Sequence, residues 1–258
     1  MDDPFYLPLG DDRWLATVHT TGPWDARFQH GGPPSALLAR AIERLSPRPD
    51  MIIARLTVDI LGAIPVGELE LRSRMLRPGR SVELVEAALS AGGRDVARAQ
   101  AWRVLRTTRQ TSARQPVRTA PALTAGGAPL AADGWVDGYL SAVEWRFAAG
   151  AFGQPGPATA WTRLRHPLVP GEQTSPLQRV LAVADSGNGI SSELDLANWH
   201  FINPELTVHL HREAVGEWIC LDAQTSISPH GVGLATSVLS DFEGPIGVGA
   251  QSLFIGQR

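Results

Sequence analysis

Apolar residues along the chain follow first the spacing of a helix and then the spacing of strands. From Leu38 to Leu45 they recur at positions i, i+3, i+4 and i+7, which predicts a helix that begins after the His-Gly-Gly-Pro-Pro-Ser sequence of residues 30–35. Before this helix, Trp14 to His19 is predicted as a short strand. After it the period changes to two, and turn sequences separate the predicted strands 69–72, 82–89 and 96–105.

The same order of elements returns in the second half of the chain. Ser175-Pro176 predicts the start of a helix, because serine caps helices and proline fits their first turn. This helix is expected to end near Asp185, with Gly187 as the residue that stops it. The strands predicted in this half are residues 143–147, 158–164, 206–210, 217–223, 233–240 and 246–255.

Three short sequences recur at nearly constant spacing, which indicates two copies of one structural unit. They are Leu-Thr-Val at residues 56–58 and 206–208, Val-Gly-Glu at 66–68 and 215–217, and Ala-Gln at 99–100 and 250–251. Their spacings are 150, 149 and 151 residues. The last of them places Gln100 and Gln251 at matching positions.

Each half therefore contains strands, one apolar helix and then several antiparallel strands. A helix that is apolar on most faces must be covered, and a long curved antiparallel sheet is the natural cover. This predicts an α+β fold of two tandem hotdog units, a double hotdog. The units are expected at residues 1–110 and 136–258, joined by a linker at residues 111–135 that is rich in Thr, Ala, Gly, Pro and Arg.

Composition narrows the class of protein. With 43% hydrophobic and 19% charged residues the chain is typical of globular proteins, and its net charge of −3 gives no general attraction for nucleic acid. All 23 basic residues are arginine, which excludes lysine chemistry such as a Schiff base. Cys220 is the only cysteine, so neither an intrachain disulfide nor a cysteine metal site is expected. Without a long apolar run or a secretion signal, we expect a cytoplasmic protein with no membrane span.

Several motifs, in their order along the chain, resemble the type-II (TesB-like) acyl-CoA thioesterases, a family of double-hotdog enzymes. In the first half these motifs are residues 30–32 (His-Gly-Gly), 37–41 and 77–81 (Arg-Pro-Gly-Arg-Ser). In the second half they are residues 181–185, 203–206, 211–212, 216–218 and 251–252. The resemblance covers most of the chain except the linker.

The resemblance implies hydrolysis of a fatty acyl-CoA to the free acid and CoA, and so a role in lipid metabolism, without metal, other cofactor or covalent intermediate. The family's catalytic Asp, at the end of the second central helix, corresponds to Asp185, and its catalytic Gln corresponds to Gln251. The family's catalytic Thr corresponds to Asn203, which departs from the commoner residue. Substrate-binding residues are expected at His30, Gly31, Gly32 and Arg80.

The residue types themselves suit this chemistry. Asp185 shares the apolar stripe of its helix with Leu181, so its carboxylate is expected to be desolvated and able to act as a general base. The side-chain amides of Asn203 and Gln251 can orient water and the thioester carbonyl. The glycine-rich sequence before the first helix is expected to offer free backbone N–H groups for an oxyanion or a phosphate.

Other interpretations stay open at this point. Asn203 before Pro204 could only shape a turn, and Gln251 could face solvent. A hotdog protein that binds acyl groups with little or no turnover is the main alternative, because Asn replaces Thr at residue 203. A hotdog hydratase or dehydratase is less favoured, since no suitably placed His follows Asp185.

Further expectations concern metal sites and partners. His209 and His211 share one strand face, but the sequence shows no third ligand at a spacing typical of a metal site. In the first copy Ile42 and Glu43 fall roughly where Asp185 would be, so one active site per chain, on the second helix, is expected. The expected partners are an acyl-CoA substrate and a second copy of the chain in a homodimer.

Overall fold

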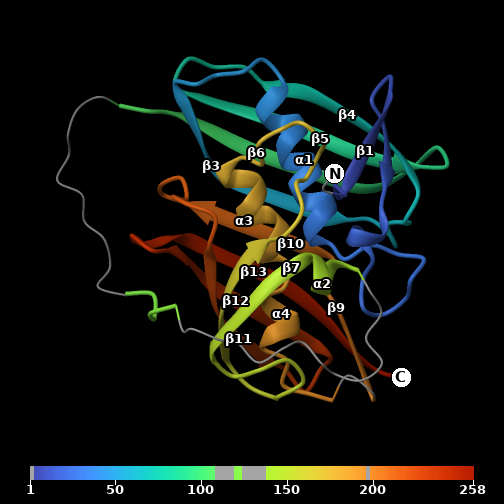
Figure 1. Cartoon of the computed structure of the whole chain (residues 1–258), viewed down its shortest axis with the longest axis vertical. Helices are drawn as coiled ribbons and strands as arrows, with labels where there is room; N and C mark the ends of the chain where they lie inside the picture. The colour runs from blue at the N-terminus through green and yellow to red at the C-terminus, as the bar shows by residue number, and fades with distance from the viewer. Residues whose placement is uncertain (1–2, 108–118, 124–137, 196–197) are drawn as a thin grey trace.

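The computed structural model of the chain describes residues 3–107, 119–123, 138–195 and 198–258 (Figure 1). In each half one apolar helix, α1 (Gly32–Arg44) or α3 (Pro176–Ala184), packs against an antiparallel sheet. The two helices lie side by side in the middle of the molecule, and the strands wrap around them (Figure 1). This is the predicted double hotdog. The predicted linker, residues 111–135, lies outside the described residues apart from residues 119–123.

The N-terminal half begins with a strand pair that the hydrophobic pattern predicts only in part. β2 (Arg13–Ala16) ends before His19, and a 3-10 helix, η1 (Val18–Thr20), replaces the rest of the predicted strand. Thr17 causes this change, because its hydroxyl accepts from the His19 N–H at 3.3 Å and caps the 3-10 helix. The other strands of this half are β1 (Tyr6–Gly10), β3 (Met51–Ile60), β4 (Glu68–Arg77), β5 (Val82–Ala91) and β6 (Arg94–Leu105).

The helix of the C-terminal half begins as predicted. Ser175 caps α3, because its hydroxyl accepts from the Gln178 N–H and the Gln178 side chain accepts from the Ser175 N–H in return. The prediction that Gly187 stops the helix is wrong: Asp185 is the C-cap of α3, and Gly187 begins the short helix α4 (Gly187–Ile190). The other elements are α2 (Tyr139–Ala142), β7 (Val143–Ala149), β8 (Ala158–Leu164), β9 (Trp199–Ile202), β10 (Glu205–Leu210), β11 (Ile219–Ile227), β12 (Val232–Asp241) and β13 (Gly244–Gln257).

The described strands form one antiparallel sheet in the order β1-β2-β4-β5-β6-β3-β10-β13-β12-β11-β8-β7, and β9 pairs with β13. β3 and β10 join the two halves. Between them Thr57 lies opposite Thr207, with 3.1 Å between the two hydroxyl oxygens. Because both threonines come from the repeated Leu-Thr-Val sequence, their contact marks an approximate two-fold axis that relates the two copies.

The strand pairing corrects the alignment of the two copies. The repeated threonines pair with Gln100 in the first copy but with Ala250 in the second, so the offset is 150 residues throughout these strands. The counterpart of Gln251 is therefore Ala101, and the prediction that Gln100 matches Gln251 is wrong by one residue. Since successive side chains of a strand point to opposite faces, Gln251 is buried, whereas Gln100 lies on the outer face and donates to Glu86.

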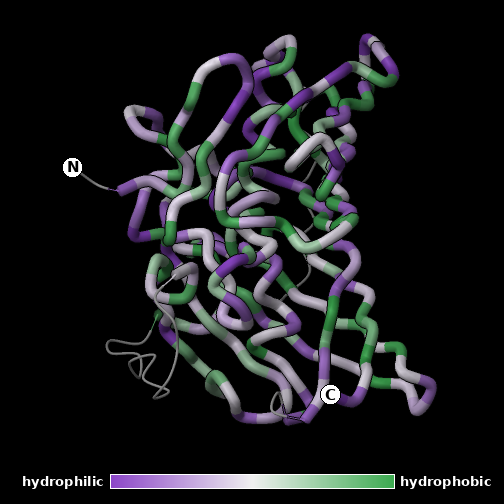
Figure 2. Tube along the Cα trace, turned by 90° about the vertical axis from the view of Figure 1, so that its right-hand side faces the viewer, coloured by the Kyte–Doolittle hydropathy of each residue, from purple (hydrophilic) through white to green (hydrophobic). Residues whose placement is uncertain are grey.

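α1 and α3 pack antiparallel and very closely. Gly32 at the start of α1 lies against α3, where a Cβ would overlap the carbonyl oxygen of Ala182. At the opposite ends, the Ser175 hydroxyl before α3 donates to the Glu43 carboxylate in the last turn of α1. Figure 2 shows how hydrophobic and hydrophilic positions are distributed along the strands. Most of the buried apolar residues of the strands belong to one core cluster with those of α1 and α3. No helix within the described residues is long and apolar enough to cross a membrane.

The strand that follows α4 is interrupted, unlike its counterpart in the first copy. It divides into β9 and β10 at Asn203-Pro204, because proline cannot donate to a sheet ladder. With the offset of 150 residues, the counterpart of Asn203 is Ile53, which lies beside a bulge of the otherwise continuous β3. The break is important for the site, since it places Asn203 between two strands and not within one.

Candidate active site

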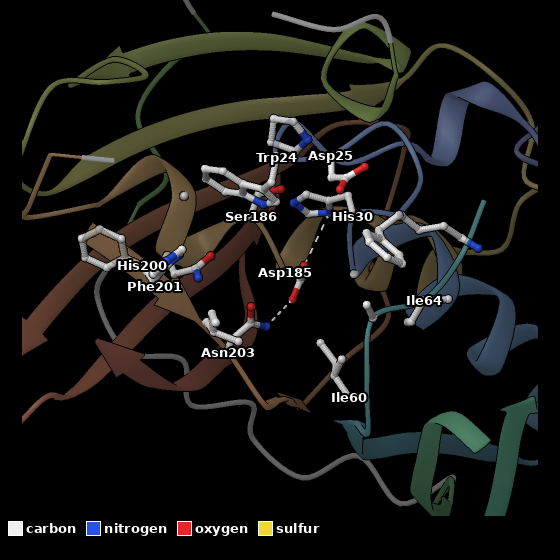
Figure 3. A pocket seen from close by; sticks show the side chains of 18 of the residues that line it. Trp24, Asp25, His30, Ile60, Ile64, Asp185, Ser186, His200, Phe201 and Asn203 are labelled. Atoms are coloured by element: carbon white, nitrogen blue, oxygen red, sulfur yellow. Dashed lines mark hydrogen bonds and ion pairs between the residues drawn. The ribbon is translucent and has the colours of Figure 1, made fainter. Parts of the chain in front are cut away.

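Asp185 lies where the end of α3 meets the start of α1. Its side chain is buried, with 4% of the residue exposed, and it forms part of the wall of a cavity (Figure 3). α3 carries the carboxylate to this place because Leu177 and Leu181, on the same stripe, pack into the hydrophobic core. The predicted desolvation of the carboxylate is therefore present in the structure.

Two side-chain amides hold one oxygen of this carboxylate. Asn203 Nδ2 donates to Asp185 Oδ1 at 2.7 Å, and Gln251 Nε2 donates to the same oxygen at 3.2 Å. Gln251 Nε2 also donates to the Asp185 backbone carbonyl at 3.0 Å, and its Oε1 accepts from the Asn188 N–H at 3.0 Å. These partners determine which end of each amide faces the carboxylate. The structure thus brings together the three side chains that were predicted as catalytic, from α3, from the β9–β10 break and from β13.

His30 faces the other oxygen of the carboxylate. Its Nδ1 lies 3.5 Å from Asp185 Oδ2 (Figure 3) and accepts from the Gly32 N–H at 3.0 Å. Since Nδ1 uses its lone pair for Gly32, the ring proton is on Nε2, and Nδ1 does not donate to Asp185. Burial lowers the pKa of His30 and outweighs the negative charge of Asp185, which acts in the opposite direction. His30 is therefore a neutral neighbour of the carboxylate and not its partner in an ion pair.

Tyr139 holds this imidazole from the other half of the chain. The rings of Tyr139 and His30 stack with their centroids 3.8 Å apart and 9° between their planes. The Tyr139 hydroxyl donates to the Ala182 carbonyl at 2.9 Å and lies 2.8 Å from the Ser186 hydroxyl in a second hydrogen bond. Burial raises the pKa of Tyr139, so the phenol stays protonated. Sequence reasoning missed Tyr139 and Ser186, because nothing near them in the chain distinguishes them from ordinary core residues.

The start of α1 offers fewer free N–H groups than predicted. The Gly32 N–H is used by His30, and Pro33 and Pro34 have no N–H. Among the described residues the Gly31 N–H has no acceptor, so it is the group of this stretch that can donate to an oxyanion. A Cβ on Gly31 would lie 2.6 Å from Asp185 Oδ2, so glycine is needed here for the close approach of the two helices.

The cavity beside Asp185 has a volume of about 630 Å³, and both halves of the chain contribute to its wall. The wall is mostly aromatic and aliphatic, which suits an apolar ligand group. Its apolar side chains include Trp24, Phe28, Ile60, Ile64, Leu140, Phe152, Trp199 and Phe201. Sequence reasoning did not single out these residues, because an apolar side chain that lines a cavity and one that fills a core follow the same pattern.

Profiles of protein families match both halves of the chain. Residues 20–104 match the acyl-CoA thioesterase N-terminal domain, and residues 119–255 match the acyl-CoA thioesterase C-terminal domain. The chain belongs to the acyl-CoA thioesterase family. The protein is therefore a thioester hydrolase, and the resemblance to the TesB-like enzymes is confirmed. The C-terminal match alone covers more than half of the chain and contains Asp185, Asn203 and Gln251.

Solved structures share the fold over nearly the whole length of this thioesterase. A protein assigned as a thioesterase II from Thermobifida fusca has a TM-score of 0.73 at 17% identity, and the match covers 97% of this chain and 95% of that one. A hotdog-fold protein from Alicyclobacillus acidocaldarius has a TM-score of 0.72 at 12% identity, with coverage of 97% and 95%. An acyl-CoA thioesterase II from Mycobacterium marinum has a TM-score of 0.68 at 14% identity, with coverage of 98% and 95%. At these identities the likeness shows the fold. A comparison with curated protein sequences found no match.

The predicted substrate-binding residues of this thioesterase divide into two groups. His30 and Gly31 line the cavity beside Asp185, and Gly32 directly behind them packs against α3. Arg80 does not join them: it lies in the exposed turn between β4 and β5 and is not part of the cavity wall. Among the lining residues, Arg258 carries a positive charge.

Within the part of the chain that the structure describes, no group of three or more His, Cys, Asp or Glu side chains could hold a metal ion.

Proposed function

We propose that this thioesterase hydrolyses a fatty acyl-CoA to the free acid and CoA, with Asp185 as the general base. One observation carries the proposal: a buried carboxylate beside an apolar cavity has its Oδ1 held by the amides of Asn203 and Gln251. Its Oδ2, which faces His30 and Gly31, is then the oxygen that can bind a water molecule. Fixed orientation of a catalytic group contributes to rate because little reorganisation is needed in the transition state.

The proposed reaction needs one carboxylate and one water. Asp185 takes a proton from the water as the water oxygen forms a bond to the thioester carbonyl carbon. The electron pair of the carbonyl double bond moves to its oxygen, which the Gly31 N–H stabilises. When this oxyanion collapses, the carbon–sulfur bond breaks, and the leaving thiolate takes the proton from Asp185. The products are the free acid and the thiol of CoA, and Asp185 is again ionised.

The neutral state of His30 fits this scheme. With its Nδ1 lone pair used by the Gly32 N–H, the imidazole does not compete with Asp185 for the proton of the water. Its place against Tyr139 keeps the ring as a fixed wall of the reaction site. Asn203 and Gln251 orient the carboxylate and, through it, the water.

The size and lining of the cavity support an acyl group as the bound part of the substrate. If each non-hydrogen atom needs about the volume of a water molecule, roughly 30 Å³, the cavity of about 630 Å³ holds roughly twenty such atoms. That is room for an acyl chain of medium length together with the end of the pantetheine arm of CoA. The phosphates of CoA lie outside, where Arg258 is a candidate to bind them, because arginine pairs well with phosphate.

Release of free thiol from acyl-CoAs of several chain lengths tests the proposal. The Asp185→Asn variant is expected to lower kcat by about 10²- to 10⁴-fold, the usual contribution of a general base. Asp222→Asn is the matched control, because Asp222 is an exposed carboxylate on β11 that accepts from Thr159. It is expected to keep the activity of the unmodified protein.

Two outcomes would contradict the proposal in different ways. Binding of acyl-CoA without thiol release at any chain length would make the protein an acyl-binding hotdog protein without turnover. Equal activity of the unmodified protein and Asp185→Asn would leave the thioesterase reaction in place but remove Asp185 from it.

A further inference from the structure

A second cavity lies at the opposite ends of the same two helices. Its volume is about 360 Å³, and its wall includes Glu43 from the last turn of α1 and Leu177 and Val180 from α3. The approximate two-fold axis between Thr57 and Thr207 relates this place to the active site. In the active site the start of α1 meets the end of α3, and here the start of α3 meets the end of α1 (Figure 1).

The two amides that hold the Asp185 carboxylate have no counterparts at the related positions of the second cavity. The counterpart of Asn203 is Ile53, which lines it, and the counterpart of Gln251 is the buried Ala101. A carboxyl group is present, since Glu43 occupies the related helix end. Both of its oxygens accept from the Ser175 hydroxyl, at 2.8 and 2.9 Å, and Oε2 also accepts from Gln178 Nε2 at 2.7 Å. Glu43 is thus engaged in holding the two helices together and has no amide pair to orient a water.

The second cavity has an apolar interior and a charged mouth. Met51, Leu177, Val180 and Ala214 are all buried and form part of its inner wall. At the mouth, Arg106 is 44% exposed and pairs with Glu213, which is 51% exposed.

An ion pair as exposed as this contributes little net stability, so Arg106 can exchange Glu213 for another carboxylate at small cost. The planar guanidinium fits such a carboxylate with two parallel hydrogen bonds. Arg48 at the same mouth is 31% exposed and adds positive charge, although it already pairs with Asp50 and Glu83.

We propose that the second cavity binds a fatty acid of about ten carbons and does not hydrolyse anything, with the tail against Val180 and the carboxylate at Arg106. The length follows from the volume, because about 360 Å³ at roughly 30 Å³ per non-hydrogen atom accommodates about a dozen such atoms. The ligand class is the acid product expected of the neighbouring site. The binding itself needs neither Asp185 nor turnover, so it stands apart from the proposed reaction.

Calorimetric titration of the full-length chain with decanoate tests this inference. Ile53 and Asn203 occupy related positions in the two copies, so tryptophan at each of them obstructs one cavity beside its carboxylate and leaves the other unchanged. The Asn203→Trp variant is expected to bind one decanoate per chain, in the second cavity. Adding Ile53→Trp to this variant is expected to abolish that binding. Thermal unfolding of both variants checks that the fold is kept.

A second pair of measurements tests the carboxylate contact without a change in the core. In the Asn203→Trp background, Arg106→Gln is expected to weaken decanoate binding about tenfold and to leave decanol binding unchanged, since only the acid needs the guanidinium. Absence of decanoate binding by Asn203→Trp, or undiminished binding after Ile53→Trp is added, would overturn the inference. An Arg106→Gln variant that binds decanoate as before would overturn the placement of its carboxylate. Thiol release by the unmodified protein reports separately on the proposed thioesterase reaction.

Discussion

Asp185 is held so closely that the neighbouring backbone has no room for a side chain. A Cβ on Gly31 would lie 2.6 Å from its Oδ2, so Gly31→Ala must push the carboxylate away from Asn203 and Gln251. We expect kcat to fall about a hundredfold, because a displacement of about 1 Å in a catalytic group has an effect of this size. Steady-state thiol release measures it. Gly189→Ala is the control, since Gly189 lines the same cavity and a Cβ there has nothing within 4 Å.

An unchanged kcat in Gly31→Ala, with the control also unchanged, would mean that the carboxylate moves without loss of function. It would then have no fixed position during catalysis. The role proposed for the two amides would fall with this result, because they act by holding that position.

His30 also gives a prediction about stability and pH. Its pKa is lowered in the folded protein by burial, whereas in the unfolded chain it is near 6.5. As the pH falls below about 6.5, the unfolded state therefore binds a proton that the folded state does not, and the free energy of unfolding decreases. The neutral variant His30→Gln lacks this effect, so its stability should fall less steeply, by up to about 1.4 kcal/mol per pH unit.

Urea unfolding of both proteins between pH 8 and pH 5 measures the difference. The comparison with His30→Gln is needed because burial also lowers the pKa of His19, which contributes in the same direction to both proteins. Parallel pH profiles of the two proteins would show that His30 is protonated as easily in the folded state as in the unfolded chain.

At the scale of elements, Arg103 on β6 ties the end of α1 to the sheet. Its guanidinium donates to the carbonyls of Ile42, Leu45 and Ser46, which have no partner inside the helix, and it forms an ion pair with Glu83. Both charged side chains are nearly fully buried. The end of α1 therefore depends on a residue far away in the sequence.

Arg103→Gln is expected to lower the free energy of unfolding by about 3 kcal/mol. Loss of one partner from a buried pair costs about 3–5 kcal/mol, and the lower value applies because Glu83 keeps Arg48 as a second partner. Arg98→Gln on the same strand is the matched control. Arg98 and Asp59 form an exposed pair, so the change should be within about 1 kcal/mol. Denaturant unfolding at neutral pH gives both values, and equal losses would contradict the structural role of Arg103.

Local signals explain which elements the sequence predicts. The start of α3 follows from Ser175 and Pro176, whose effect on the chain depends only on the next few residues. The end of α3 near Asp185 was predicted correctly, but the role of Gly187 was not. Gly187 begins α4, and a Cβ there would lie 2.6 Å from the Ser237 hydroxyl oxygen, so glycine allows a close approach here and does not act as a stop. The strand predicted from Trp14 to His19 ends early, at Ala16. The Thr17 hydroxyl caps a 3-10 helix that begins there.

The match of Gln100 with Gln251 shows how sensitive strand arguments are to register. An error of one residue exchanges the core face for the solvent face, which separates the buried Gln251 from the outward Gln100. The Leu-Thr-Val repeat carries the correct offset of 150 residues, and the pairing of Thr57 with Thr207 agrees with it. The pairing of strands, which no local pattern contains, decides between the two alignments.

For the whole molecule, the double hotdog and three of the site residues could be predicted, but the wall of the site could not. Asp185, Asn203 and Gln251 follow from position-by-position resemblance, and hydrogen bonds in the structure join the three side chains, whose catalytic role stays a prediction. The stacking of His30 on Tyr139 joins the two halves of the chain. Such a contact depends on how β3 meets β10 and how α1 meets α3, and these are properties of the assembled sheet.

Because the site is shared between the halves, neither half should be active alone. The C-terminal half carries Asp185, Asn203 and Gln251, but His30 and Gly31 come from the N-terminal half, as do several apolar residues of the cavity wall. Alone, it would also expose the face of α3 that packs on α1 and the edge of β10 that pairs with β3. We therefore expect the separate C-terminal half to aggregate and to release no thiol.

Two chains of residues 1–118 and 119–258, produced together, test this expectation. The cut falls between the two regions matched by the thioesterase profiles, so it removes no residue of either. The β3–β10 ladder and the packing of α1 on α3 should hold the two chains in a one-to-one complex that hydrolyses acyl-CoA. Size-exclusion chromatography with a thiol-release assay measures assembly and activity together. Full activity in the C-terminal half alone would show that the N-terminal half is dispensable for the reaction. The contacts of His30 and Gly31 with Asp185 would then play no role in catalysis.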